Sequence, residues 1–165
     1  MNRSTSFALA APLFAAFALA ACGNDTGTAE GPAVVQAEDA WCRPTPNGVF
    51  VGGCYVTLTS SRTDRLVSVA SPASPVVEIH EMTMDGDMMR MGELENGLPL
   101  PAGEVVTLRP GAEHLMLMAL SEPLTEGAVV PLTLTFEHAA EVMVEAQVRQ
   151  PEGAAGAAEA DHADH

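Results

Sequence analysis

The chain contains no lysine, and its seven basic residues are all arginines. Against them stand 22 Asp and Glu residues, which give the 165-residue chain a formal net charge of −15. Nucleic acids and anionic bilayer surfaces bind proteins through clustered cationic side chains, so this composition excludes binding to either of them by charge. The electrostatic field of such an acidic protein would attract cations or a basic protein partner. Acidic residues that only keep the surface solvated explain the composition equally well.

Aromatic residues are scarce at 4%, and no long stretch shows the 3.6-residue period of a helix. Short apolar alternations recur instead, separated by Pro, Gly or Asn, as is typical of sandwich and barrel folds. Nine segments have this strand pattern: 34–42, 49–59, 65–71, 75–84, 87–94, 104–110, 113–120, 129–137 and 141–148. The joints between strands are marked by prolines at 72, 75, 99, 101, 110 and 131. We therefore predict an all-β fold, a single sandwich domain over residues 33–150 whose core combines Val, Leu and Ala with Trp41 and Phe136.

The first residues have the three parts of a secretory signal. Arg3 is followed by an apolar run over residues 7–20, too short for a comfortable membrane span, and small residues precede Cys22. The tetrapeptide Leu-Ala-Ala-Cys that ends at this cysteine resembles the bacterial lipobox, in which the cysteine becomes the lipidated first residue. We expect residues 1–21 to be a lipoprotein signal peptide and Cys22 to anchor an exported protein to a membrane facing the periplasm. The alternative is an ordinary signal cleaved near Ala21, which would leave a free thiol.

Both ends of the mature chain lack large apolar residues. Residues 22–32 are polar and Gly-rich, which is typical of a flexible tether between lipid and fold. Residues 151–165 are expected to be a disordered acidic tail. The tail carries His162 and His165 among Asp and Glu, donors that suit Cu(II), so an auxiliary Cu(II) site is one hypothesis. A solvated tail with two incidental histidines is the other.

The chain has three cysteines. If Cys22 carries lipid, Cys42 and Cys54 remain as a pair in an oxidising compartment. Both lie in strand-like segments that are connected by a Pro- and Gly-containing turn. A disulfide across neighbouring strands is the expected outcome, worth about 3 kcal/mol by loop entropy. A redox or metal-binding dithiol is the alternative, and no C-x-x-C spacing supports it.

Five of the nine methionines lie between residues 82 and 91, directly after a histidine at position 80. In a strand, residues two apart share a face, so His80 and Met82 point to one side. The same spacing places His114 and Met116 on one side of another segment, while the leucines between them face the core. Met89 and Met91 share a face in a third segment. These rows predict a set of metal ligands that turns away from the core.

Thioether sulfur is soft and uncharged, and among common biological ions it suits Cu(I). Zinc prefers thiolate, imidazole or carboxylate, and calcium prefers oxygen. Thioethers neither titrate nor form disulfides, which suits a copper site outside the cytoplasm. For any single residue a structural role is the alternative, because methionine fills core gaps and a lone histidine is usually hydrogen-bonded. The occurrence of two histidines, each followed two residues later by methionine, favours the metal site.

Three stretches resemble the periplasmic copper chaperones called PCu(A)C proteins: IHEMTMDGDMMRM, LPAGEVVTLRPGAEHLMLMAL and LTEGAVVPLTLTFEHAAEVMVEAQV. The segment AWCRPTPNGVFVGGCYVTL is similar to the start of these proteins. Their motif is a histidine, ten residues, a methionine, about twenty-one residues and then His-x-Met. In this chain His80 is followed by ten residues and Met91, and a further 22 residues precede His114 and Met116.

The resemblance implies a cupredoxin-like Greek-key β-sandwich that binds Cu(I) through His80, Met91, His114 and Met116. It further implies a copper chaperone that delivers the ion to the copper-A centre of cytochrome c oxidase subunit II, directly or with a Sco-type thiol protein. Met82 and Met89 are candidates for auxiliary metal ligands or for a hydrophobic rim on which a partner docks.

Two other functions remain open. An electron-transfer cupredoxin would need a cysteine thiolate beside two histidines, and no cysteine lies near His114 in the sequence. A structural β-sandwich lipoprotein without metal is the second. No pairing of nucleophile and base stands out along the chain, so we do not expect an enzyme.

Overall fold

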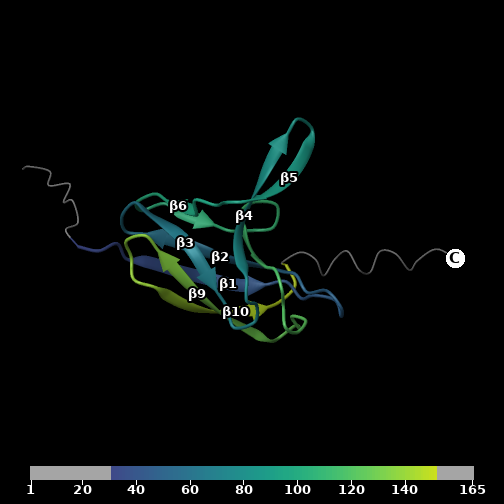
Figure 1. Ribbon diagram of the computed structural model, residues 1–165. Coiled ribbons are helices and arrows are strands. Elements are labelled where there is room, and N and C mark those ends of the chain that lie inside the picture. The colour runs from purple at the N-terminus through teal and green to yellow at the C-terminus, as the bar shows by residue number, and fades with distance from the viewer. Residues whose placement is uncertain (1–30, 152–165) are drawn as a thin grey trace, which may run out of the picture.

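The computed structural model describes residues 31–151, and these fold into ten strands (Figure 1). The strands are β1 (Val35–Cys42), β2 (Gly52–Ser60), β3 (Asp64–Ala70), β4 (Val77–Asp85), β5 (Met88–Glu93), β6 (Leu98–Leu100), β7 (Val105–Thr107), β8 (His114–Leu117), β9 (Val129–Phe136) and β10 (Val142–Val148). No helix that could cross a membrane occurs among the described residues. The predicted signal peptide, Cys22 with most of its tether, and the tail with His162 and His165 lie outside them.

The strands are joined in the order β5-β4-β8-β2-β1-β10-β9-β3-β6, and β7 pairs with β2. Strands far apart in the sequence are neighbours, such as β4 with β8 and β3 with β9, as Greek-key connections require. All pairs are antiparallel except β1 with β10. The predicted all-β, single-domain sandwich is confirmed.

The core lies between the two halves of this sheet, and strand alternation determines which side chains enter it. In β9 every second residue is buried, from Val130 to Phe136, while the residues between are exposed or half-buried. Leu115 and Leu117 of β8 are fully buried in the same cluster, together with Ile79 of β4. Burying one such leucine contributes roughly 2 kcal/mol, so this alternation specifies the register of each strand.

The two predicted core aromatics occupy different faces. Phe136 lies in the main core, as predicted. Trp41 is buried too, but on the opposite face of β1, where its ring lies 4.4 Å from that of Tyr55 between centroids. The Arg149 guanidinium covers the Trp41 ring at 4.9 Å. Trp41 therefore shields the outer face of the sheet.

Two expectations about prolines were wrong, and a strand was missed as a result. The segment Leu98–Leu100 contains a proline and yet forms β6, which pairs with β3. As an edge strand, β6 has no second neighbour to which Pro99 would need to donate. Pro131 lies inside β9, and its carbonyl accepts a hydrogen bond from the Ser71 hydroxyl at 2.8 Å. The backbone N–H that Pro131 lacks would point towards β3, like its carbonyl. The pairing of β9 with β3 ends at Thr133, so no ladder hydrogen bond is lost at Pro131.

Cys42 and Cys54 are joined by a disulfide and are fully buried. They are direct partners in the register between β1 and β2. The bond therefore fixes the alignment of the two strands and points into the core, away from the face that carries the histidines.

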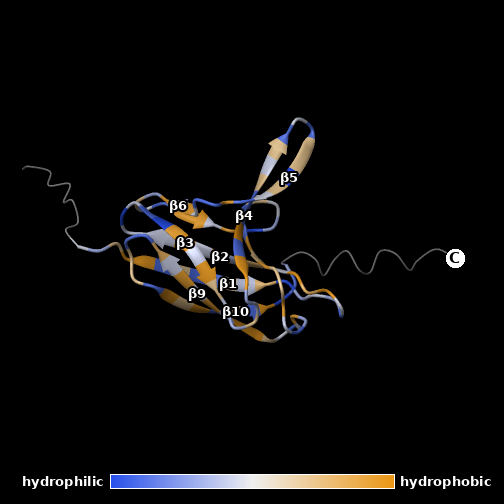
Figure 2. Ribbon diagram, in the orientation of Figure 1, coloured by the Kyte–Doolittle hydropathy of each residue, from blue (hydrophilic) through white to orange (hydrophobic). Residues whose placement is uncertain are grey.

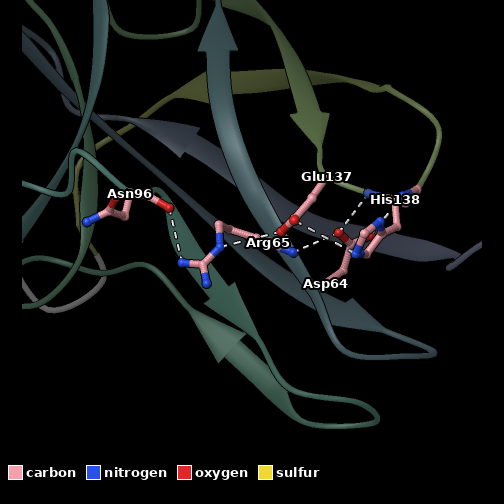
Figure 3. A network of polar contacts seen from close by, with 6 residues as sticks. Asp64, Arg65, Asn96, Glu137 and His138 are labelled. Atoms are coloured by element: carbon pink, nitrogen blue, oxygen red, sulfur yellow. Dashed lines mark hydrogen bonds and ion pairs between the residues drawn. The ribbon is translucent and has the colours of Figure 1, made fainter.

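Asp64 joins the start of β3 to the turn that follows β9 (Figure 3). Its carboxylate accepts backbone N–H bonds from Arg65 at 2.7 Å, His138 at 3.0 Å and Ala139 at 2.8 Å. Burial raises the pKa of Asp64, but these three bonds and the charge of His138 outweigh it, so the pKa lies below its ordinary value of 3.8. The charged carboxylate is the form that the fold stabilises.

The β4–β5 hairpin extends beyond the body of the sandwich (Figure 1). Figure 2 shows hydrophobic colour along both of its strands and a hydrophilic tip. Strand β4 continues from the sheet, where Val77 to His80 pair with β8, into the hairpin, where its residues pair with β5 alone. The methionine-rich segment therefore begins at the sheet and ends in solvent.

Candidate metal centre

His80 and His114 are direct partners in the antiparallel pairing of β4 and β8. Their side chains therefore share one face of the sheet, the face opposite Ile79 and Leu115 of the core. The ring centroids are 5.8 Å apart and the planes are nearly perpendicular, at 67°. Both histidines are buried, each with 7% of its surface exposed. Two imidazoles from segments far apart in the sequence thus meet at one place.

A backbone carbonyl fixes the protonation of His114. Its Nδ1 lies 2.8 Å from the carbonyl oxygen of Ala112, which only accepts hydrogen bonds, so Nδ1 carries the proton. In the neutral ring this leaves a lone pair on Nε2. Nε2 faces the sulfur of Met91 at 3.3 Å. An unprotonated nitrogen and a thioether sulfur are therefore held side by side.

A carboxylate has the same effect on His80. Its Nε2 lies 2.7 Å from Oε2 of Glu78, and an ionised carboxylate only accepts, so Nε2 donates. In the neutral ring Nδ1 then has the lone pair. This atom is buried and has no hydrogen-bond partner among the described residues. Leaving a buried polar atom unpaired costs about 1–3 kcal/mol, which a ligand bound at Nδ1 would recover.

Both arrangements are typical of metal-binding histidines, which donate the second ring N–H to a carboxylate or carbonyl and so hold the other nitrogen ready. Glu78 has this positioning role for His80, and the sequence did not reveal it. Alternation places Glu78 on the same face as His80, but nothing in the spacing shows which nitrogen it contacts.

The two methionines of the expected ligand set lie on this same face. Met91 is on β5, directly opposite Met82 of β4, and has 52% of its surface exposed. Met116 is on β8, two residues beyond His114 and directly opposite Glu78. It is half-buried. The structure thus brings Met91 into contact with His114 and places Met116 one pair further along the sheet.

An aromatic wall bounds the site on the side of β2. The Tyr55 ring lies 6.5 Å from His114 and 4.4 Å from Trp41 between centroids. Burial raises the pKa of the Tyr55 hydroxyl above 10.0, although the charge of Arg43 and a hydrogen bond with it offset part of the rise. Tyr55 is therefore neutral at physiological pH, and no charge enters the site from this side.

The candidate ligands on this face are two imidazole nitrogens and thioether sulfurs, which carry no charge when the rings are neutral. The Glu78 carboxylate shares the face, and its Oε2 is bonded to Nε2 of His80. Within residues 31–151, no three His, Cys, Asp or Glu side chains gather closely enough to hold an ion. A site here depends on sulfur from methionine, and that donor set fits a soft monovalent ion such as Cu(I) better than zinc or calcium.

The auxiliary candidates Met82 and Met89 lie on the hairpin. Met82 pairs with Met91 next to the histidines, and Met89 pairs with Met84 further out. Cys42 and Cys54 lie on the core side, in their disulfide.

Comparison with known proteins gives matches of two kinds. The LpqE-like lipoprotein family matches residues 35–148. The "Putative lipoprotein Lxx21020" of Leifsonia xyli subsp. xyli (strain CTCB07) is 32% identical over 120 residues, which are 73% of this chain and 72% of the relative.

Two solved structures are similar in both sequence and fold. The copper-bound PCuAC domain from PmoF2 is 28% identical, with a TM-score of 0.58 over 71% of this chain and 93% of the domain. The Cu(I) form of DR1885 from Deinococcus radiodurans is 27% identical, with a TM-score of 0.57 over 80% of this chain and 87% of that protein.

Proposed function

Because the chain belongs to the LpqE-like lipoprotein family and shares its fold with copper-binding PCuAC domains, we propose that it is an exported, lipid-anchored copper chaperone that carries Cu(I). The observation that carries the proposal is a pair of imidazole nitrogens on one face, one from each histidine, that the neighbouring oxygen acceptors leave unoccupied. Nδ1 of His80 is buried without a partner, and Nε2 of His114 faces the sulfur of Met91.

In this proposal His80 and His114 bind copper through nitrogen, and Met91 and Met116 bind it through sulfur. The ion is cargo, so the site must release it as well as hold it. Neutral ligands bind Cu(I) without the strong charge attraction of a thiolate cage. Met91 lies on an exposed hairpin, where a partner can displace it. These properties support a carrier and not a catalyst.

The recipient we propose is the copper-A centre of cytochrome c oxidase subunit II, with a Sco-type thiol protein as partner. This part of the proposal rests on the resemblance to PCu(A)C proteins. A thiol partner would take the ion by replacing Met91 first, because that ligand is the most exposed member of the set.

The electron-transfer alternative requires a cysteine thiolate at the metal. Cys42 and Cys54 are both in a buried disulfide on the core side of the sheet, so neither supplies one. The metal-free structural lipoprotein is the other alternative. It does not explain why Nδ1 of His80 is buried without a hydrogen-bond partner among the described residues.

A Cu(I) titration against a chromophoric chelator tests the function. The mature chain is made soluble by Cys22→Ser and kept anaerobic under reductant. We expect one equivalent of copper to be withheld tightly from the chelator, and His114→Ala and Met91→Leu each to lose it. Met143→Leu is the matched control, because Met143 is 82% exposed on β10 and far from the site in sheet order. Unchanged affinity in His114→Ala would reject the proposed ligands.

A further inference from the structure

The β4–β5 hairpin has two chemically different faces. Cross-strand pairing places Met82 opposite Met91 and Met84 opposite Met89, and alternation puts both pairs on the face of His80. The other face carries Thr83 opposite Arg90, Asp85 opposite Met88, and Glu81 opposite Gly92. Asp85 and Arg90 form an ion pair at 2.6 Å. One face is thus a ladder of four thioethers, and the other is mainly polar.

The choice of methionine on this face has no packing explanation. Met84 is 64% exposed and Met89 is 57% exposed, so neither gains much by burial. Val, Ile and Thr are the residues that exposed strand pairs favour. Methionine has a flexible side chain, and ordering that side chain costs conformational entropy. Methionine is nevertheless the only large apolar residue type between positions 81 and 92. Sulfur, and not apolar area, is what these positions have in common.

We propose that Met84 and Met89, with Met82, form a second Cu(I) site that receives the ion and passes it to the His80–His114 centre. The proposal deepens the proposed function and rests on it. Side chains directly opposite in an antiparallel pair have Cβ atoms about 5 Å apart, so two flexible thioethers can share one ion. The opposing residues at positions 84 and 89 are such a pair.

The spacing of the ladder allows transfer in short steps. Successive pairs on one face are about 7 Å apart along a strand, so one ion cannot bind both pairs fully, but a single flexible side chain can reach from one to the other. The bond from copper to Met84 or Met89 breaks as a bond to Met91 forms, while Met82 stays bound. A second exchange then replaces a thioether with a histidine nitrogen. Each step exchanges one neutral ligand for another, so no proton or electron moves.

The charge around the hairpin favours loading a cation at its outer end. Asp85 ends β4 beside Met84 but is paired with Arg90, so among the described residues Asp87 in the turn is the unpaired carboxylate nearest the tip. The whole chain has a formal net charge of −15. Ligands without charge leave the bound ion with its full positive charge, so the surrounding field attracts it to the tip. Exposed carboxylates are weak ligands for Cu(I), so they concentrate the ion without holding it.

The test follows the methionine methyl groups directly. The mature chain carrying Cys22→Ser is labelled with 13C at the methionine methyls and titrated with Cu(I) alone, anaerobically. Loss of one signal in each Met→Leu variant assigns the spectrum. We expect the first equivalent to shift Met91 and Met116, and a second, weaker equivalent to shift Met84 and Met89. A titration in which the Met84 and Met89 signals never move would overturn the inference.

Variants separate this inference from the proposed function. Met84→Leu/Met89→Leu should lose the second equivalent, keep the first and load it more slowly. Met88→Leu is the control on the other face of the same hairpin and should keep both equivalents. Equal losses in the control and the double variant would indicate a general effect of the hairpin and contradict a sulfur site. If the tight equivalent is missing from the unsubstituted chain, the proposed function fails; if only the second is missing, this inference fails alone.

Discussion

At the scale of single residues, the site depends on which ring nitrogen carries a proton. Glu78 holds the proton of His80 on Nε2, and the Ala112 carbonyl holds that of His114 on Nδ1. The remaining ring nitrogens, Nδ1 of His80 and Nε2 of His114, are then the ones left to bind an ion. Preparing the ligands in this way lowers the cost of ordering them when copper binds.

Replacing Glu78 tests this positioning. Glu78→Leu removes the acceptor for Nε2 of His80, so the ring loses its fixed orientation and its preferred tautomer. We expect the affinity for Cu(I) to fall about 10–100-fold, the usual effect of losing such a partner. Glu78→Gln keeps an oxygen acceptor and should lose less. Chelator competition measures both, and thermal unfolding without copper checks that each variant is folded. Equal affinity in Glu78→Leu and the unsubstituted chain would mean that Glu78 does not position the ligand.

The faces of these residues were predictable, but their contacts were not. Alternation alone placed His80 and Met82 on one side of their strand and His114 and Met116 on one side of theirs. It gave no indication that the two strands pair with His80 directly opposite His114, because register between distant segments depends on the whole sheet. The contact of Glu78 with Nε2 depends on a side-chain rotamer, which spacing does not determine.

At the scale of elements, the strand pattern was informative wherever burial followed alternation. All nine segments expected as strands contain one, and in most of them the core covers an apolar face. Strand β5 is the exception, because all six of its residues are exposed. Strand β6 was missed because its central residue is a proline, and a three-residue edge strand has too little alternation to recognise. The extension of the β4–β5 hairpin beyond the sandwich was also not predictable. Strand β8 pairs with β4 only as far as His80, and the sequence of β4 does not show where that pairing ends.

Asp64 connects β3 to the turn after β9, and its contribution to the free energy of unfolding should depend on pH. Asp64→Asn replaces one acceptor oxygen with a donor that faces backbone N–H groups, so we expect a loss of about 2 kcal/mol at pH 6. The folded pKa of Asp64 is below 3.8, the ordinary value, so the charged form stabilises the fold above that pH. As the pH falls below 3.8 through the folded pKa, the difference from Asp64→Asn should shrink. Urea unfolding at several pH values measures it, and a difference that grows towards low pH would contradict this assignment.

At the scale of the whole molecule, the proposed function links anchoring to copper transport. A copper carrier outside the cytoplasm would remain near a membrane-bound recipient if lipid holds it there. The matches to lipoproteins support the lipid anchor, and the chemistry of Cys22 remains a proposal.

Membrane fractionation tests the anchor. We expect the unsubstituted protein to sediment with membranes and Cys22→Ser to be released from them, because the substitution removes the thiol that the lipid would modify. Both forms should bind Cu(I) equally, since position 22 is outside the sandwich. Membrane retention of Cys22→Ser would show that something other than a lipid on this cysteine holds the protein.

The central claim is that neutral nitrogen and sulfur from β4, β5 and β8 bind one monovalent copper ion together. X-ray absorption at the copper edge, on the reduced chain loaded with one equivalent, counts these neighbours directly. We predict both nitrogen and sulfur around the copper, with the sulfur signal reduced in Met91→Leu. A copper ion surrounded by nitrogen and oxygen alone would contradict the account.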